Sequence, residues 1–430
     1  MLDNLKNKLT IYNQVHLLDF YNEISFLEQN ELIVDINSID FKLMKKLYVE
    51  SYKDEVIDIS KISPLTIMNK NDKNYNIGEQ LIKSNKYAIV IMAGGSASRL
   101  GLNIPKGCIE LDLNGKKISL FELFINQLKD VYIKYGTYIN LYIMTNDEYD
   151  QRIKDFFLKK NYFNYDKKSI HFFKQHNLPI LDIKGNVLLK NKYSILKGPN
   201  GNGDVFKSLK ESNMLDDMIK KNIEFVLFST TDNILVNLVD YSFIGNTIAN
   251  NYKLATKTIE KENENELDWV FCKYNNKPYM LPSAYISKDL TNYKINNDFV
   301  YREKNITHHL VNINSVVKFA NIDLKYHRSY KKNMFIDVDG NVNNGKTNNS
   351  FKFEKFIFDA FYYEDDMLLY RVNKNEFFPI KTKEDLKSVS EILKKNNWCN
   401  FNYFFYTFFM LLWFFISFFI PVLNATSINE

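Results

Sequence analysis

Residues 87–106, YAIVIMAGGSASRLGLNIPK, decide the fold of this chain. An apolar run ends abruptly at Gly94-Gly95, and Arg99 and Lys106 follow a few residues later. The run predicts a buried strand, and the glycines predict a loop whose backbone N–H groups can approach a phosphate closely. Arg99 and Lys106 would add fixed positive charge for a nucleotide triphosphate. An ordinary strand-to-helix turn is the alternative interpretation of the two glycines alone.

The spacing of the glycines matches neither the dinucleotide motif GxGxxG nor the Walker motif GxxxxGK[ST], so both readings are disfavoured. The composition, with 45% hydrophobic and 25% charged residues, is that of a globular protein. The net charge of +5 is spread along the chain, and nucleic acid is therefore not an expected partner. The three cysteines, Cys108, Cys272 and Cys399, form no CxxC pair, which favours a reducing compartment such as the cytoplasm.

Residues 401–422 form an uncharged, aromatic-rich segment that is long enough to span a bilayer as a helix. Lys394 and Lys395 precede it, as the positive-inside rule requires on the cytosolic side. The segment is interpreted as a tail anchor that leaves the rest of the chain facing the cytosol. A buried apolar helix and a translated intron or frameshift are the alternatives. The polar N-terminus has no apolar core and is not a signal peptide.

The sequence pattern changes at about residue 84. Residues 1–84 carry apolar side chains at helical spacing and predict a helical N-terminal lobe. Over residues 85–398, short apolar strands alternate with amphipathic helices, which predicts an α/β, Rossmann-like fold: a mixed, mainly parallel sheet with helices on both faces. Ligands bind such sheets at the carboxyl ends of the strands, where Gly94 lies. The expected strands are 87–93, 138–145, 169–173 and 225–230.

The 87–106 segment resembles the signature LxxGGxGTRLGxxxPK of sugar-nucleotide pyrophosphorylases, although Ala97 stands where the family usually has glycine. The chain is identified as similar to the eukaryotic UDP-N-acetylglucosamine pyrophosphorylases over roughly residues 85–398, because the UDP-glucose branch has a NGGLGTxMG loop instead. Six further segments keep the resemblance in order: FFKQHNLP (172–179), GPNGNGDVFKSL (198–209), FVLFSTTDNILVNLVD (225–240), LKYHRSYKKNMFID (324–337), FEKFIFDAF (353–361) and EFFPIKTKED (376–385).

The resemblance implies a nucleotidyltransferase, GT-A-like fold and a uridylyltransferase activity. UTP and N-acetylglucosamine 1-phosphate would give UDP-N-acetylglucosamine and pyrophosphate, with Mg²⁺ or Mn²⁺ as the cofactor. The implied catalytic residues are Arg99, Lys106 and Lys381, and Asp232 would hold the metal and substrate phosphates. The other implied substrate-binding residues are Gly94, Gly95, Gln175, Gly201, Asn202, Asn305, Phe356 and Phe358.

The departures from the family pattern gather on the side of the sugar. Trp269 replaces glycine and is expected to add bulk, while Pro282 replaces a glutamate. Residues 302–304 (Arg-Glu-Lys) precede Asn305 and are expected to add charge. Two alternatives therefore stay open: a UDP-sugar pyrophosphorylase with another acceptor, and a non-catalytic relative that binds UDP-sugar. The family's C-terminal domain is replaced by the apolar segment, so no oligomeric state is implied.

Overall fold

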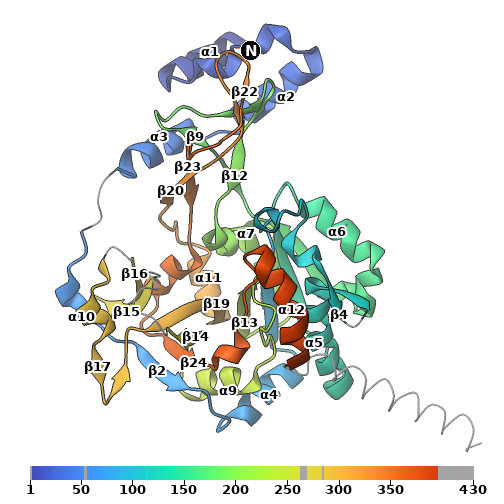
Figure 1. Cartoon of the computed structure of the whole chain (residues 1–430), viewed down its shortest axis with the longest axis vertical. Coiled ribbons are helices and arrows are strands. Elements are labelled where there is room, and N and C mark those ends of the chain that lie inside the picture. The colour runs from blue at the N-terminus through green and yellow to red at the C-terminus, as the bar shows by residue number, and fades with distance from the viewer. Residues whose placement is uncertain (1, 53–55, 114, 262–268, 283–284, 396–430) are drawn as a thin grey trace, which may run out of the picture.

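The computed structural model describes residues 2–52, 56–113, 115–261, 269–282 and 285–395 (Figure 1). A central sheet with helices on both faces forms the larger part of the molecule, and a lobe containing the N-terminal helices stands above it. The expected α/β class is therefore confirmed.

The central sheet is mixed and mainly parallel. Among the described residues it has eight strands, of which only β19 runs antiparallel to its neighbours. The other neighbours pair in parallel. All four strands expected from the sequence are present, with ends that differ by at most two residues. In spatial order the strands are β2 (Thr66–Asn69), β24 (Leu368–Arg371), β14 (Leu254–Glu260), β19 (Glu303–Asn312), β13 (Phe225–Thr230), β3 (Tyr87–Met92), β6 (Asn140–Thr145) and β7 (Ile170–Lys174).

Strand β3 is apolar throughout because both of its faces are covered. Ile89 and Ile91 pack into one core, and Val90 packs into a second core on the opposite face. Seven helices supply the rest of these cores. The first is covered by α4 (Tyr75–Lys83), α5 (Leu120–Tyr135), α6 (Asp150–Lys159) and α9 (Tyr241–Ala249), and the second by α7 (Val205–Glu211), α8 (Met214–Lys220) and α11 (Ile313–Phe319).

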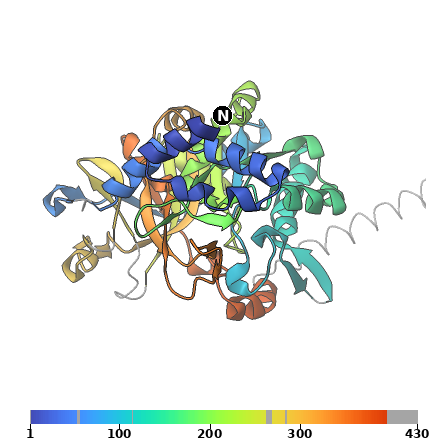
Figure 2. The same ribbon diagram turned by 90° about the horizontal axis from the view of Figure 1, so that it is seen from above.

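The N-terminal lobe is built from three helices and from strands that come much later in the chain (Figure 2). Helix α2 begins at a capping box, in which Ser25 and Glu28 satisfy each other's backbone N–H groups. Its buried Leu32 and Ile36 share a core with Phe351 and Phe353. The helices are α1 (Leu2–Ile11), α2 (Phe26–Asn37) and α3 (Phe41–Glu50).

The strands of the lobe arise from two segments that rise out of the central domain. The first contributes β8 (Asn177–Pro179), β9 (Leu181–Asp182), β10 (Leu189–Asn191), β11 (Ser194–Ile195) and β12 (Lys197–Pro199), and the second β20 (His327–Lys331), β21 (Phe335–Ile336), β22 (Val342–Asn343) and β23 (Ser350–Glu354). By contrast, β2 and α4 fall inside the expected lobe of residues 1–84 but belong to the central domain. Strand β2 pairs at the edge of the central sheet, and α4 packs into the core on one of its faces. The division into domains 1–84 and 85–398 stays a prediction.

Smaller elements border the central sheet. One group is β1 (Ile62–Ser63), β15 (Val270–Tyr274), β16 (Lys277–Leu281), α10 (Lys288–Thr291), β17 (Lys294–Ile295) and β18 (Asp298–Phe299); the other is the hairpin β4 (Glu110–Leu113) and β5 (Lys116–Ser119) with α12 (Lys383–Lys395). Helices of the described part of the chain are too short or too polar to cross a membrane. Residues 401–422 lie outside the described residues, so the tail anchor stays a prediction.

Candidate active site

The carboxyl ends of four neighbouring strands define one edge of the central sheet. Met92 at the end of β3 is in register with Thr230 of β13 and with Met144 of β6. Thr145 is in register with Lys174, the last residue of β7. The loops that follow these strands therefore lie side by side, and they carry the glycine loop, Gln175 and Asp232.

The glycine loop folds back on itself after β3. The backbone N–H of Ala97 donates to the Ile104 carbonyl at 3.0 Å, and that of Lys106 donates to the Gly95 carbonyl at 3.1 Å. Ala97 is fully buried, so its methyl group fills a core position at the family's glycine. Gly95 is exposed, and a side chain there would meet open space. The backbone at Gly95 is thus accessible to a ligand.

Gly94 and Gln175 lie against each other. A Cβ atom at Gly94 would come within 2.2 Å of the Gln175 Nε2 atom. Asn146, which follows β6 directly, donates from Nδ2 to the Gly94 carbonyl at 2.8 Å. Sequence reasoning missed Asn146, although a polar residue directly after a buried strand is a signal that could have found it. The structure thus brings together Gly94 and Gln175, two of the implied substrate-binding residues, and adds Asn146, which fixes the loop.

Lys106 and Asp232 form an ion pair at the same edge. The Lys106 Nζ atom donates to Asp232 Oδ1 at 2.7 Å and to the Ile380 carbonyl at 2.9 Å. The side chain of Lys106 is 11% exposed and that of Asp232 is 44% exposed. Lys106 is therefore fixed from two sides, whereas Asp232 can still reach a ligand from solvent.

The segment that carries Lys381 is paired with the residues around Asp232. The N–H of Ile380 donates to the Asp232 carbonyl at 3.0 Å. The Asn233 side chain accepts from the Phe378 N–H at 2.8 Å and donates to the Glu376 carbonyl at 2.9 Å. These bonds bring the backbone of Lys381, the residue after Ile380, to the Lys106–Asp232 pair.

Lys381 and Arg99 are both exposed at this edge. Within the described part of the chain neither side chain pairs with a carboxylate, so both charges are available to a phosphate. The N–H groups of Lys381 and Thr382 donate to the Asp385 carboxylate at 2.8 and 2.7 Å, and Thr382 caps the start of α12 in return. Asp385 therefore fixes the backbone at Lys381.

The Gly-Asn-Gly turn, which is implied to bind the substrate, also has a structural role. Gly201 has φ +88°, and a Cβ atom there would come within 2.4 Å of the Lys355 carbonyl. The Asn202 Oδ1 atom accepts from the Ile357 N–H at 3.0 Å. The turn thus holds the segment that carries Phe356, and the amide nitrogen of Asn202 is left to donate to a ligand hydroxyl.

An aromatic cluster continues from this turn. The rings of Phe356 and Phe358 stack with centroids 5.1 Å apart. Trp269 packs on Phe358 at 4.9 Å and on Phe356 at 6.0 Å, and His327 lies 4.7 Å from Phe356. The tryptophan that departs from the family pattern therefore contacts Phe356 and Phe358, both of which are implied to bind the substrate.

Asn305 lies in β19, whose first residues reach the same edge because the strand is antiparallel. Its Oδ1 atom accepts from the Thr307 N–H at 2.7 Å, inside a β-bulge where Thr307 has φ +53°. A positive φ at a β-branched residue is strained, and bulges of this kind often aim side chains at functional sites.

Arg302 and Glu303, which are expected to add charge on the side of the sugar, are both bound within the protein. Arg302 donates to the Thr291 carbonyl at 2.9 Å and stacks on Phe299 at 3.5 Å. Glu303 is 1% exposed and pairs with Arg371 at 2.6 Å. Their charges are engaged with the hairpin β17–β18 and with β24 instead.

Asp232 has the chemistry of a Mg²⁺ ligand. Mg²⁺ is commonly held by one or two carboxylates together with substrate phosphates and water, and the single half-exposed carboxylate of Asp232 fits that pattern. No cluster of three or more His, Cys, Asp or Glu side chains among the described residues forms a metal site of its own. The donor set therefore fits an ion that arrives with a nucleotide.

The comparisons with known proteins agree with this geometry. The sequence profile of the UTP–glucose-1-phosphate uridylyltransferase family matches residues 38–402. The UDP-N-acetylglucosamine pyrophosphorylase of Saccharomyces cerevisiae is 28% identical over 81% of this chain and 78% of its own length. UDP-N-acetylglucosamine diphosphorylase 1 of Arabidopsis thaliana is 28% identical over 88% of this chain and 78% of its own length.

A solved structure shows the same fold. The uridine diphosphate N-acetylglucosamine pyrophosphorylase of Trypanosoma brucei matches with a TM-score of 0.73 and 23% identity, over 91% of this chain and 84% of that chain. The family profile spans the glycine loop, Asp232 and Lys381 alike. This chain belongs to the UTP–glucose-1-phosphate uridylyltransferase family.

Proposed function

We propose that this protein is a uridylyltransferase that makes UDP-N-acetylglucosamine and pyrophosphate from UTP and N-acetylglucosamine 1-phosphate. The names of its relatives in yeast and in Arabidopsis support this substrate pair. The convergence of Lys106, Asp232 and Lys381 beside an open glycine loop carries the proposal, because two cations and one carboxylate at one edge suit the binding of a triphosphate with its metal ion.

The chemistry needs no general base. The attacking phosphate oxygen of the sugar 1-phosphate is already ionised at neutral pH, and it displaces pyrophosphate from the α-phosphorus of UTP. Catalysis must therefore come from positioning and from neutralisation of charge. Arg99 and Lys106 would bind the triphosphate, and Lys381 would neutralise the charge that grows on the transferring group. Mg²⁺ bound through Asp232 would supply further neutralisation.

The remaining predicted residues divide between the base and the sugar. Gly94, Gly95 and Gln175 would contact uracil through backbone and amide hydrogen bonds, since the Gln175 side chain already lies against Gly94. The sugar and ribose side of the pocket would be formed by Gly201, Asn202, Asn305, Phe356 and Phe358.

A second candidate function is the same transfer to an acceptor that lacks the acetamido group. Trp269 favours it, because its indole packs on Phe356 and Phe358 and takes up space on the side of the sugar. The other alternative is a non-catalytic relative that only binds UDP-sugar. Such a protein would bind UTP but release no pyrophosphate, which distinguishes it from both enzymes.

Pyrophosphate release by the full chain with UTP, Mg²⁺ and N-acetylglucosamine 1-phosphate tests the activity. Lys106→Met should abolish release, while Lys184→Met, which changes an exposed lysine of the N-terminal lobe, should not. Equal release by both variants would contradict the proposed role of Lys106.

A further inference from the structure

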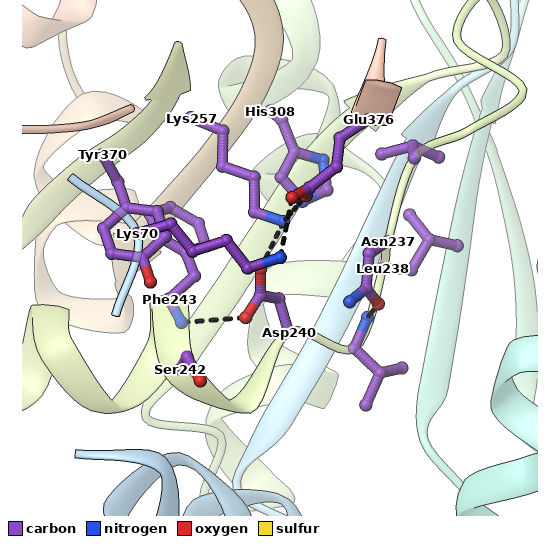
Figure 3. A network of polar contacts seen from close by, with 12 residues as sticks. Lys70, Asn237, Leu238, Asp240, Ser242, Phe243, Lys257, His308, Tyr370 and Glu376 are labelled. Atoms are coloured by element: carbon purple, nitrogen blue, oxygen red, sulfur yellow. Dashed lines mark hydrogen bonds and ion pairs between the residues drawn. The ribbon is translucent and has the colours of Figure 1, made fainter. Parts of the chain in front are cut away.

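Four charged side chains, Lys70, Asp240, Lys257 and Glu376, form a network (Figure 3), and Glu376 lies in the segment that leads to Lys381. The Nζ atom of Lys257, on β14, lies 2.5 Å from Asp240 Oδ2 and 3.5 Å from Glu376 Oε2. Lys70, just after β2, donates to Glu376 Oε1 at 2.7 Å. Two cations and two carboxylates thus neutralise one another.

The centre of this network is shielded from solvent. The side chains of Lys257 and Asp240 are 2% and 5% exposed. Burial opposes ionisation of Asp240, yet the charge of Lys257 and a hydrogen bond from the Phe243 N–H hold the pKa of that carboxyl below its usual value. Burial and the nearby charge of Lys257 keep the pKa of His308 far below its usual value, so the imidazole in Figure 3 stays neutral. Lys257 therefore depends on Asp240 and Glu376 for compensation.

Glu376 connects this network to the candidate active site. Its carboxylate contacts Lys257 and Lys70, while its backbone carbonyl accepts from the Asn233 side chain at 2.9 Å. Residues 378–380 then pair with residues 232–234, and the Ile380 carbonyl accepts from Lys106. Among the described residues this segment forms an isolated bridge and not a regular strand, and Ile380 and Phe378 pack into the core beside α12. Glu376 adds an attachment to the charges of Lys257 and Lys70.

We propose that Lys257 and Glu376 are positioning residues, whose ion pair fixes segment 376–381 so that Lys381 faces the phosphates of UTP. The inference rests on the proposed function, because it gives Lys381 a role in phosphoryl transfer. Both residues act through Lys381 and are not catalytic themselves. A displacement of about 1 Å in such a group can cost about 100-fold in rate, so a rigid attachment is needed.

Glu376→Gln tests this because it removes the charge and keeps the shape, while Asp240 still compensates Lys257. We expect kcat to fall about tenfold with little change in the KM for UTP, since the loss concerns positioning in the transition state. Glu376→Asp restores the charge and should recover part of the loss. Asp35→Asn is the control, because it removes the carboxylate that pairs with Lys197 in the N-terminal lobe. It should lower thermal stability without lowering kcat.

A double-mutant cycle with Lys381→Ala separates positioning from general destabilisation. Glu376→Gln should lower kcat in the wild-type background and leave it unchanged in the Lys381→Ala background. An equal loss in both backgrounds would overturn the inference. Wild-type kcat in Lys381→Ala would instead contradict the role that the proposed function gives to Lys381.

Hydrogen exchange gives a readout that does not depend on turnover. Glu376→Gln should speed the exchange of the Phe378 and Ile380 amides, whose hydrogen bonds join the segment to Asn233 and Asp232. Asp35→Asn should leave these amides unchanged. Unchanged exchange in Glu376→Gln would overturn the inference even if the protein proved inactive in every assay.

Discussion

Lys106 and Asp232, 126 residues apart in the sequence, form an ion pair with 2.7 Å between Nζ and Oδ1. Parallel strands β3 and β13 bring them together, because the loops after both strands open at the same edge of the sheet. Lys106 is also fixed by the Ile380 carbonyl, so its charge is in place before a nucleotide arrives. Preorganised charge of this kind is usually the largest single contribution to catalysis by such sites.

Asp232→Asn should lower kcat/KM by about 10²–10³-fold, by analogy with the loss of other preorganised groups. The thermal midpoint should change little, because the side chain is half exposed and ion pairs at such positions contribute little to stability. Pyrophosphate release and thermal unfolding measure the two effects. Glu224→Gln, which breaks an exposed ion pair with Lys86, is the matched control and should leave turnover intact. Similar turnover in both variants would count against the site.

Gly94→Ala should weaken UTP binding by about tenfold, since its methyl group would displace the Gln175 amide from its place beside the loop. Isothermal titration with UTP measures the effect. In the Gln175→Ala background the clash is absent, and Gly94→Ala should then have no further effect on affinity. Equal weakening in both backgrounds would show that the two residues do not act together.

The stability that His176 contributes should depend on pH. Its Nδ1 atom lies 2.8 Å from Asp204 Oδ2 and its Nε2 atom 2.7 Å from Glu211, and the hydrogen bond to Asp204 in particular raises the pKa of His176 despite its partial burial. A histidine whose pKa is raised on folding contributes its full stabilisation below the pKa of the unfolded state, which is about 6.5. That stabilisation is lost as the pH rises through the pKa of the folded state.

His176→Gln should therefore lower the free energy of unfolding more at about pH 6 than at about pH 9. Urea unfolding of both proteins at the two pH values measures the difference. If the free energies of unfolding of the two proteins differed by the same amount at both pH values, protonation of His176 would contribute nothing to stability.

Trp269→Gly should change the choice of acceptor. Removal of the indole from Phe356 and Phe358 enlarges the pocket on the side of the sugar. The ratio of kcat/KM for N-acetylglucosamine 1-phosphate over glucose 1-phosphate should rise about tenfold, a typical effect of one small group in a pocket. An unchanged ratio would place Trp269 outside the acceptor pocket.

The sequence predicts the centre of the sheet well and its edge poorly. Residues 87–92 and 225–230 are continuously apolar because helices cover both faces, and such runs are recognisable without any structure. The edge strand β2, Thr66–Asn69, is short and only half buried, so it carries no such signal. The apolar spacing of residues 1–84 predicts a helical lobe but not the strands that join it, because these come from residues 177–199 and 327–354, and packing between distant segments leaves no local pattern.

The site was likewise predictable only where a local sequence motif marks the residue. Lys106, Asp232 and Lys381 were expected from motif positions, and the structure places them at one edge. Lys257 was not found, because in a chain with many lysines a single one in a strand looks like a surface residue. Its burial follows only from the approach of Asp240 and Glu376, which local sequence does not show.

Identification of the sugar nucleotide that forms tests most directly whether the protein transfers a uridylyl group. The full chain would be incubated with UTP, Mg²⁺ and, in separate reactions, the 1-phosphates of N-acetylglucosamine, N-acetylgalactosamine and glucose. Mass spectrometry would then identify the sugar nucleotide, and the pyrophosphate released would be counted against it. We expect UDP-N-acetylglucosamine and pyrophosphate in equal amounts. UTP binding without any sugar nucleotide from the three acceptors would contradict it.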